Sequence, residues 1–153
     1  MTQPIIREAI KDDLKAVKSL LDRASLPSID IEKHLLIFFV LENVRTIVGT
    51  IGMELYGNTA LLRSLAIQKD YRNKGCGKEL YYALISKATK LNVINIYLLT
   101  ETAEGFFSKE GFQKIDREVV PHTIKKTHEY STLCPEGAVC MVKRLNEESS
   151  LIP

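Results

Sequence analysis

The fold is decided by one stretch of the chain, Leu65-Ala66-Ile67-Gln68-Lys69-Asp70-Tyr71-Arg72-Asn73-Lys74-Gly75-Cys76-Gly77-Lys78. It begins in an apolar segment that predicts a strand over 59–68. It ends where apolar residues at every third or fourth position predict a helix over 77–91. Glycines let a backbone approach a ligand closely, and the first turn of a helix has unpaired N–H groups at its positive end. The stretch therefore predicts an anion site, with phosphate as the expected ligand.

Two common phosphate-binding loops do not fit this stretch. A P-loop would need glycine at position 72 and serine or threonine at position 79, where the chain has Arg72 and Glu79. A dinucleotide-binding loop that began at Gly75 would need glycine or alanine at position 80, where the chain has Leu80. A plain strand-to-helix turn, in which the glycines only relieve backbone strain, is the alternative to a ligand site.

The rest of the chain predicts a sheet with helices. After residue 59 the order is strand, loop, helix, strand, helix, strand, which implies parallel pairing at the sheet centre and hairpins on one side. Strands are expected over 4–9, 34–42, 46–55, 59–68, 94–100, 113–118 and 138–144, and helices over 14–24, 77–91, 103–110 and 121–127. Residues 28–33 are expected to form a loop or one helical turn, and residues 128–135 a polar loop.

Composition describes one soluble domain. The chain has 153 residues, 45% hydrophobic and 26% charged, and its longest apolar run, 35–41, is far shorter than the roughly 20 residues of a membrane span. A net charge of +2 argues against a nucleic-acid partner. Three cysteines and a charged N-terminal segment favour a cytoplasmic chain without a secretory signal. We expect a single domain over 1–145, a tail over 146–153 and no membrane partner.

The loop also has the pattern R-x-x-G-x-G, formed by Arg72, Gly75 and Gly77. This pattern, with the apolar strand before it, resembles the pyrophosphate loop of the GNAT superfamily of acyl-CoA N-acyltransferases. The resemblance extends over nearly the whole length of the chain. The resemblance implies the GNAT fold, of class α/β (α+β): a central mixed, mostly antiparallel sheet of six to seven strands with helices on both faces. It also implies acetyl-CoA as cosubstrate, with its pyrophosphate on the loop and its pantetheine arm beside the strand. The cofactor-binding residues that it implies are Leu65, Ala66, Ile67, Arg72, Asn73, Lys74, Gly75, Cys76, Gly77, Lys78 and Phe107.

The C-terminal third carries a finer resemblance. Thr100, Ala103, Phe107 and Gly111-Phe112 keep the spacing of the family, and with the segment 132–141 they are similar to GNAT proteins encoded in arsenic-resistance operons. The acetyltransferase domain of N-acetylglutamate synthases is more distantly similar. Both resemblances imply a small amino-acid-like amine as substrate, and an arsenical or phosphinic analogue of glutamate is one such amine.

Transfer to an amine needs a base for the amine proton, hydrogen-bond donors for the oxyanion and, in many relatives, a tyrosine that protonates the leaving thiolate. Phe107 stands where the family has that tyrosine. Thr100 is the favoured substitute, and a reaction without an acid is the alternative. Glu54 and Glu101 lie near predicted strand ends and are the expected bases. Further candidates are the hydroxyls of Ser108 and Tyr130, and His128 and Glu129 as bases; for each candidate a solvated surface position is the alternative.

Arg63 interrupts the apolar strand, where a guanidinium needs an anion or a cleft to offset its desolvation. Alternation along the strand puts it on the face of Leu61 and Leu65. Two interpretations stay open: Arg63 binds the carboxylate of an amino-acid substrate, or it forms an internal ion pair with Glu54 as the candidate partner. Lys125, and after it Arg117, are other candidates for the substrate carboxylate.

No metal site is expected. Cys134 and Cys140 have the spacing C-x5-C, which is poor for zinc. We expect Cys140 in the core and Cys134 in a loop, and arsenic coordination by the two thiols is the alternative. The leading function is direct acetyl transfer to a small amine. An acetyltransferase of peptide or protein amines and an acyl-CoA-binding module without turnover stay open, as does a homodimer.

Overall fold

The computed structural model describes residues 3–33, 37–133 and 137–145. Seven strands form one sheet in the order β1-β2-β3-β4-β5-β7-β6. β4 and β5 pair in parallel, whereas β1 with β2, β2 with β3, β5 with β7 and β6 with β7 pair antiparallel. The expected mixed, mostly antiparallel sheet with helices on its faces is therefore confirmed. The strands are β1 (Ile5–Glu8), β2 (Phe38–Asn43), β3 (Thr46–Tyr56), β4 (Thr59–Ile67), β5 (Asn95–Thr100), β6 (Gln113–Ile115) and β7 (Val139–Arg144).

Five helices accompany these strands in the described part of the chain: α1 (Leu14–Arg23), α2 (Cys76–Lys90), α3 (Glu104–Lys109), α4 (His122–Lys125) and α5 (His128–Leu133). Among the residues described, no helix is long and apolar enough to cross a membrane. The chain divides into two units, residues 1–54 with 63–87 and residues 55–62 with 88–153, which are described separately below. The expected domain boundary at 145 stays a prediction, because the tail lies outside the described residues.

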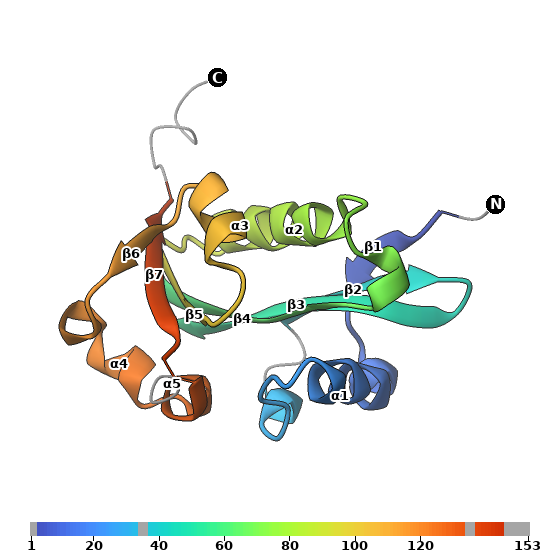
Figure 1. Ribbon diagram of the computed structural model, residues 1–153, viewed down its shortest axis with the longest axis horizontal. Helices are drawn as coiled ribbons and strands as arrows, with labels where there is room; N and C mark the ends of the chain where they lie inside the picture. The colour runs from blue at the N-terminus through green and yellow to red at the C-terminus, as the bar shows by residue number, and fades with distance from the viewer. Residues whose placement is uncertain (1–2, 34–36, 134–136, 146–153) are drawn as a thin grey trace. The chain divides into compact units, whose positions relative to one another are not determined.

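In the first unit, α1 and α2 lie on opposite faces of the sheet (Figure 1). Val17 and Leu21 of α1 pack with Val40 and Ala66 in a core whose members are almost wholly excluded from water. On the other face, a Cβ built at Gly49 of β3 would lie 3.2 Å from a side-chain carbon of Leu80 in α2. Because there is so little room at this position, β3 and α2 pack closely, and the start of α2 is held against the sheet.

In the second unit, β5 and β7 carry the core. This core contains Leu61, Leu99 and Cys140, which pack with Val120 and Ile124. Val120 precedes α4, and Ile124 lies in it. Cys140 is 4% exposed, as expected for a core cysteine. Helix α3 lies on the side of these strands opposite to α4 and α5 (Figure 1).

Three expected elements differ from the structure. β2 begins at Phe38, later than the expected start, and residues 34–36 lie outside the described part of the chain. β6 ends at Ile115 instead of 118, because Arg117–Val119 forms a 3-10 turn before Pro121. The polar loop expected after residue 127 was wrong as far as residue 133, because helix α5 forms there. Its start is stabilised by the hydroxyl of Thr127, which accepts the N–H of Tyr130 at 3.1 Å.

Ser64 changes the alternation along β4. Its φ is 64°, in the left-handed region that a strand residue rarely adopts. Arg63 before it contacts the segment that follows α1, and Ala66 after it packs into the α1 core. Ala66, rather than Leu65, therefore shares the α1 face with Arg63. The expectation that Leu65 lies on that face was wrong, because a left-handed residue shifts the two-residue period by one.

Candidate active site

The glycine loop has the backbone of an anion site. It runs from a 3-10 turn, Lys69–Tyr71, into α2, with φ of 62° at Asn73 and 83° at Gly75. The carbonyl of Gly75 accepts the N–H of Glu79 at 3.0 Å, which is the first hydrogen bond of the helix. The amides of Cys76 and Gly77 precede that bond, so the turn has no helical carbonyl for them. These amides are suited to bind an anion at the positive end of a fifteen-residue helix.

The outer side of the loop is open. A Cβ built at Gly75 or at Gly77 would meet no heavy atom within 4 Å. The left-handed φ of Gly75 favours glycine for its own conformation, whereas Gly77 has no such requirement and keeps only the space open. A phosphate oxygen can therefore approach the backbone here without displacing a side chain.

Two basic side chains lie against this loop. Arg72 donates from Nε to the carbonyl of Ile67 at 2.8 Å, so its guanidinium stays next to the end of β4. The Nζ of Lys74 lies 5.9 Å from the ring centre of Tyr71. Arg72, Lys74 and Lys78 are all exposed, so the local positive field that the sequence predicts is present at the surface of the loop.

Tyr71 ties the loop to the sheet. Its hydroxyl accepts a hydrogen bond from Nδ2 of Asn43, the last residue of β2, at 2.7 Å. The sequence alone does not connect these two residues, because they are 28 positions apart and no local spacing relates them. The bond holds the 3-10 turn in place and thereby positions the start of α2.

Cys76 is buried inside the loop and contributes packing. Burial, reinforced by the nearby Glu79 carboxylate, raises the pKa of its thiol above the ordinary value. A protonated thiol is a poor nucleophile. Cys76 is therefore suited to bind an anion through its backbone N–H and not through its sulfur.

Arg63 and Glu54 are brought together, with Asp30 as a further partner. NH1 of Arg63 donates to Oε2 of Glu54 at 2.7 Å and to Oδ2 of Asp30 at 2.8 Å. NH2 donates to Oδ1 of Asp30 at 2.8 Å and to the carbonyl of Pro27 at 3.2 Å, and Nε donates to Oγ of Ser64 at 3.0 Å. All five N–H donors of the guanidinium thus have protein acceptors, and its side chain is 0% exposed.

This arrangement favours the internal ion pair over the substrate clamp for Arg63 in the structure as it stands. Glu54 is 2% exposed, and one of its carboxylate oxygens is bonded to Arg63. A base must present a lone pair to the amine that it deprotonates. The geometry therefore favours a structural role for Glu54 over the base role expected of it.

The predicted catalytic residues of the second unit lie around the end of β5. Thr100 is 8% exposed, and its Oγ1 accepts the N–H of Ala103 at 2.8 Å, just before α3. This bond uses an oxygen lone pair and leaves the hydroxyl proton able to donate. Glu101 is exposed at the next position. Thr100 thus has both a structural contact and the capacity to act as an acid, and Glu101 is accessible to solvent.

Phe107 is a core residue. It is 3% exposed and packs edge-to-face with Phe106 and Phe112, at ring-centre distances of 5.1 and 5.4 Å. Aromatic pairs at such distances stabilise a core beyond the area that they bury. The ring that replaces the family's tyrosine therefore holds α3 in place, and its expected contact with the cofactor stays a prediction.

The other predicted site residues are distributed over α3, α4, α5 and the turn before α4. Glu129 is 2% exposed on α5. Tyr130 and Lys125 are half-buried, whereas Ser108, Arg117 and His128 are exposed. The exposed residues fit the solvated alternative. Among the residues described, no group of three or more His, Cys, Asp or Glu side chains could hold a metal ion. Cys134 lies outside the described residues, so its pairing with Cys140 around arsenic stays a prediction.

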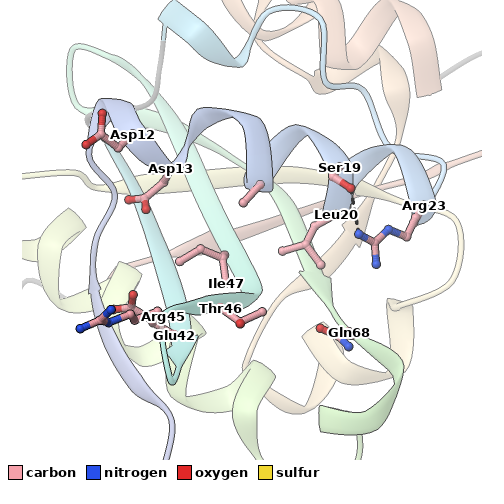
Figure 2. Close-up of a pocket in the computed structure, with 11 residues that line it drawn as sticks. Asp12, Asp13, Ser19, Leu20, Arg23, Glu42, Arg45, Thr46, Ile47 and Gln68 are labelled. Carbon is pink, nitrogen blue, oxygen red and sulfur yellow. Dashed lines mark hydrogen bonds between the residues drawn. The ribbon is translucent and has the colours of Figure 1, made fainter.

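A cavity of about 370 Å³ lies in the first unit (Figure 2). One side of it is formed by Asp12 and Asp13 and by a stripe of α1 that ends at Arg23, and the other is the β2–β3 hairpin with Gln68, which follows β4. Arg7 pairs with two of its carboxylates, since it bonds both oxygens of Asp13 at 2.8 and 2.9 Å and Glu42 at 3.0 Å. None of the predicted site residues lines this cavity.

A mixed sheet with a parallel β4–β5 pair, and an open glycine loop that enters the helix after β4, fit the class of acyl-CoA-dependent acyltransferases that the resemblance predicts. Residues 34–114 match the family described as "Acetyltransferase (GNAT) domain". The chain belongs to this GNAT acetyltransferase family, and the resemblance predicted from its loop is confirmed. It is accordingly an N-acetyltransferase that uses acetyl-CoA.

The chain is also similar to three particular proteins, two in sequence and one in fold. The chain is 31% identical over 121 residues to an uncharacterized N-acetyltransferase of Chlorobaculum tepidum, with 76% of each chain covered. It is 35% identical over 66 residues to an amino-acid acetyltransferase of Buchnera aphidicola subsp. Schizaphis graminum, which is 43% of this chain and 15% of that protein. Its fold is similar to that of N-acetylglutamate synthase from Neisseria gonorrhoeae, solved with coenzyme A and N-acetyl-glutamate. That similarity has a TM-score of 0.82 at 22% identity and covers 94% of this chain and 35% of the synthase. This chain thus spans only a minor part of the latter two proteins.

Proposed function

We propose that the enzyme transfers the acetyl group of acetyl-CoA directly to the amine of a small amino-acid-like substrate. The observation that carries the substrate class is the 35% identity, over 66 residues, to an amino-acid acetyltransferase. The open loop at the start of α2 supports the cofactor half of the proposal, because its amides suit a pyrophosphate. A cytoplasmic location and a homodimeric state remain predictions from the sequence.

The proposed reaction requires at most two proton transfers that involve side chains, one to the leaving thiolate and one from the attacking amine. The amine nitrogen attacks the thioester carbonyl, the C–S bond breaks, and the CoA thiolate leaves. Thr100 is our candidate to donate a proton to that thiolate, because its hydroxyl proton is available and Phe107 has none to give. Glu101 is our candidate for the amine proton, because the ion pair of Glu54 with Arg63 disfavours Glu54. Arg63 and Lys125 remain the candidates for a substrate carboxylate.

Release of CoA thiol from acetyl-CoA in the presence of a panel of free amino acids tests this function. The panel includes glutamate and its phosphinic and arsinic analogues, and a blocked lysine peptide is measured beside it. Turnover on free amino acids supports the proposal, and preference for the arsinic analogue over glutamate supports the resemblance to arsenic-resistance enzymes. Turnover only on the peptide would replace the proposal with a peptide acetyltransferase. Binding of CoA without turnover on any amine would replace it with a binding module.

A further inference from the structure

The partners of Arg63 differ in how exposed they are. The Glu54 side chain, on β3, is 3% exposed, and the guanidinium is 0% exposed. Asp30, in the connection between α1 and β2, is 18% exposed at its side chain. Of the two carboxylates, Asp30 is therefore the more accessible to solvent.

In the cluster of Arg63, Glu54 and Asp30, charge balance requires only one of the two carboxylates. Arg63 carries one positive charge, whereas Glu54 and Asp30 together carry two negative charges. If Asp30 is removed, Arg63 and Glu54 still form a neutral pair, so the buried guanidinium is not left without a counter-charge. A second carboxylate can then take the place of Asp30 without changing the charge of the cluster.

The geometry of the Asp30 contact is that of a bound carboxylate. Both oxygens of Asp30 accept from the guanidinium, one from each terminal nitrogen, at 2.8 Å each. This paired arrangement is the one that arginine forms with any free carboxylate. Ser64 and Pro27 hold the Nε and the second NH2 hydrogen, so they fix the orientation of the fork whichever carboxylate lies in front of it.

We propose that Arg63 carries a carboxylate-binding site, which the side chain of Asp30 occupies in this structure and from which a free carboxylate displaces it. In the absence of a ligand, Asp30 satisfies the buried guanidinium. The ligand class is a small monocarboxylate or the carboxylate of an amino acid. That the displacing carboxylate belongs to the amine substrate rests on the proposed function, whereas the existence of the site does not.

Chemical complementation of Asp30→Gly tests the site without any turnover. The full chain is unfolded thermally in rising sodium acetate, with chloride lowered to keep the ionic strength constant. Acetate is expected to raise the Tm of Asp30→Gly saturably, by about 2–4 °C. Wild type should respond weakly, because Asp30 competes with acetate. Asp116→Gly, at an exposed aspartate in the second unit, is the matched control and should respond no more than wild type does.

Two further variants keep the test decisive. Asp30→Asn preserves the shape of the side chain and one acceptor oxygen, so it serves if Asp30→Gly does not fold, and it should show a smaller rise with acetate. The variant Asp30→Asn, Glu54→Gln, Arg63→Met removes the guanidinium without leaving the buried Glu54 carboxylate unpaired, and it should lose the response. Equal responses of wild type and the folded Asp30 variant to acetate would overturn the proposal and leave Asp30 as a structural partner only.

A kinetic measurement then asks whether the substrate uses this site. For an amino acid that is acetylated, Asp30→Asn should lower KM severalfold, because the internal competitor is weakened, while the α-amide of the same amino acid keeps its KM. A purely structural role for Asp30 would raise both KM values or neither. If acetate binds but the two KM values do not separate, the assignment of the substrate carboxylate to Arg63 fails. Absence of turnover on every amino acid instead counts against the proposed function.

Discussion

Replacing Gly77 by alanine should make the protein more stable and at the same time weaken its use of acetyl-CoA. Gly77 lies in the first turn of α2, where its added Cβ would meet no heavy atom within 4 Å and where its φ does not require glycine. Alanine in place of glycine in a helix stabilises by about 0.5–1 kcal/mol. For a chain of this length that corresponds to a rise in Tm of about 1–4 °C.

The same methyl group would stand on the open side of the loop, where we propose that the pyrophosphate binds. It would hold a phosphate oxygen away from the first-turn amides. Loss of one hydrogen bond to a charged group costs about 1.5–3 kcal/mol, which is a rise in KM for acetyl-CoA of about 10-fold to 150-fold. Thermal unfolding without ligand measures the first effect. Initial rates of thiol release at varied acetyl-CoA measure the second.

Gly105→Ala in α3 is the matched control. Gly105 likewise has no heavy atom within 4 Å of a built Cβ and no left-handed φ, so the variant should gain stability and keep the wild-type KM for acetyl-CoA. Equal KM values for Gly77→Ala and Gly105→Ala would refute the placement of the pyrophosphate on the loop. A fall in the Tm of Gly77→Ala would refute the argument from open space.

Three other variants test the packing and the charges of the first unit. Thr50 is 0% exposed and its hydroxyl has no hydrogen-bond partner among the described residues, so Thr50→Val should raise the free energy of unfolding by about 1 kcal/mol in a urea titration. A Cβ on Gly52 would overlap the buried ring of Phe38, so Gly52→Ala should lose about 1–3 kcal/mol in the same assay, and an unchanged midpoint would contradict the close packing. Arg7 holds the pKa of Asp13 below its ordinary value of 3.8, so this contribution to stability is complete above pH 4 and is lost as pH falls through the lower, folded-state pKa. Asp13→Asn should therefore flatten the fall in Tm below pH 4, and an unchanged slope would exclude Asp13 as its source.

Most of the sheet could be predicted from the sequence, because its signals are local. The turn after Tyr56, the leucine repeat of α2 and the glycines before it each lie within a few residues of the element that they define. Helix α5 was missed because its six polar-rich residues show no apolar period, although Thr127 ahead of them is a residue type that starts helices. Nothing in the sequence predicts the shift of alternation at Ser64, since a serine in a strand gives no indication of a left-handed φ.

The candidate site was predictable where it is made of backbone and less so where it is made of side chains. The loop pattern identifies amides that are consecutive in the chain. Arg63 was correctly singled out as a buried charge in need of a partner, and its pairing with Glu54 was one of the two interpretations. Asp30 could not be found, because it lies 33 positions away in a connection with no regular pattern. Long-range ion pairs depend on how strands and loops meet, which local spacing does not determine.

The hydrogen bond from Asn43 to Tyr71 also bears on the order in which the chain folds. Synthesis proceeds from the N-terminus, so β2 and β3 emerge before the loop does. Asn43 is therefore synthesised before Tyr71, so the partner of the loop is already in the nascent chain when the loop emerges. Acetyl-CoA, as a ligand of the folded chain, would on our proposal stabilise the hairpin together with the loop. Nascent chains that have not yet released residues 71–78 lack this stabilisation, and their hairpin has to persist on its own packing.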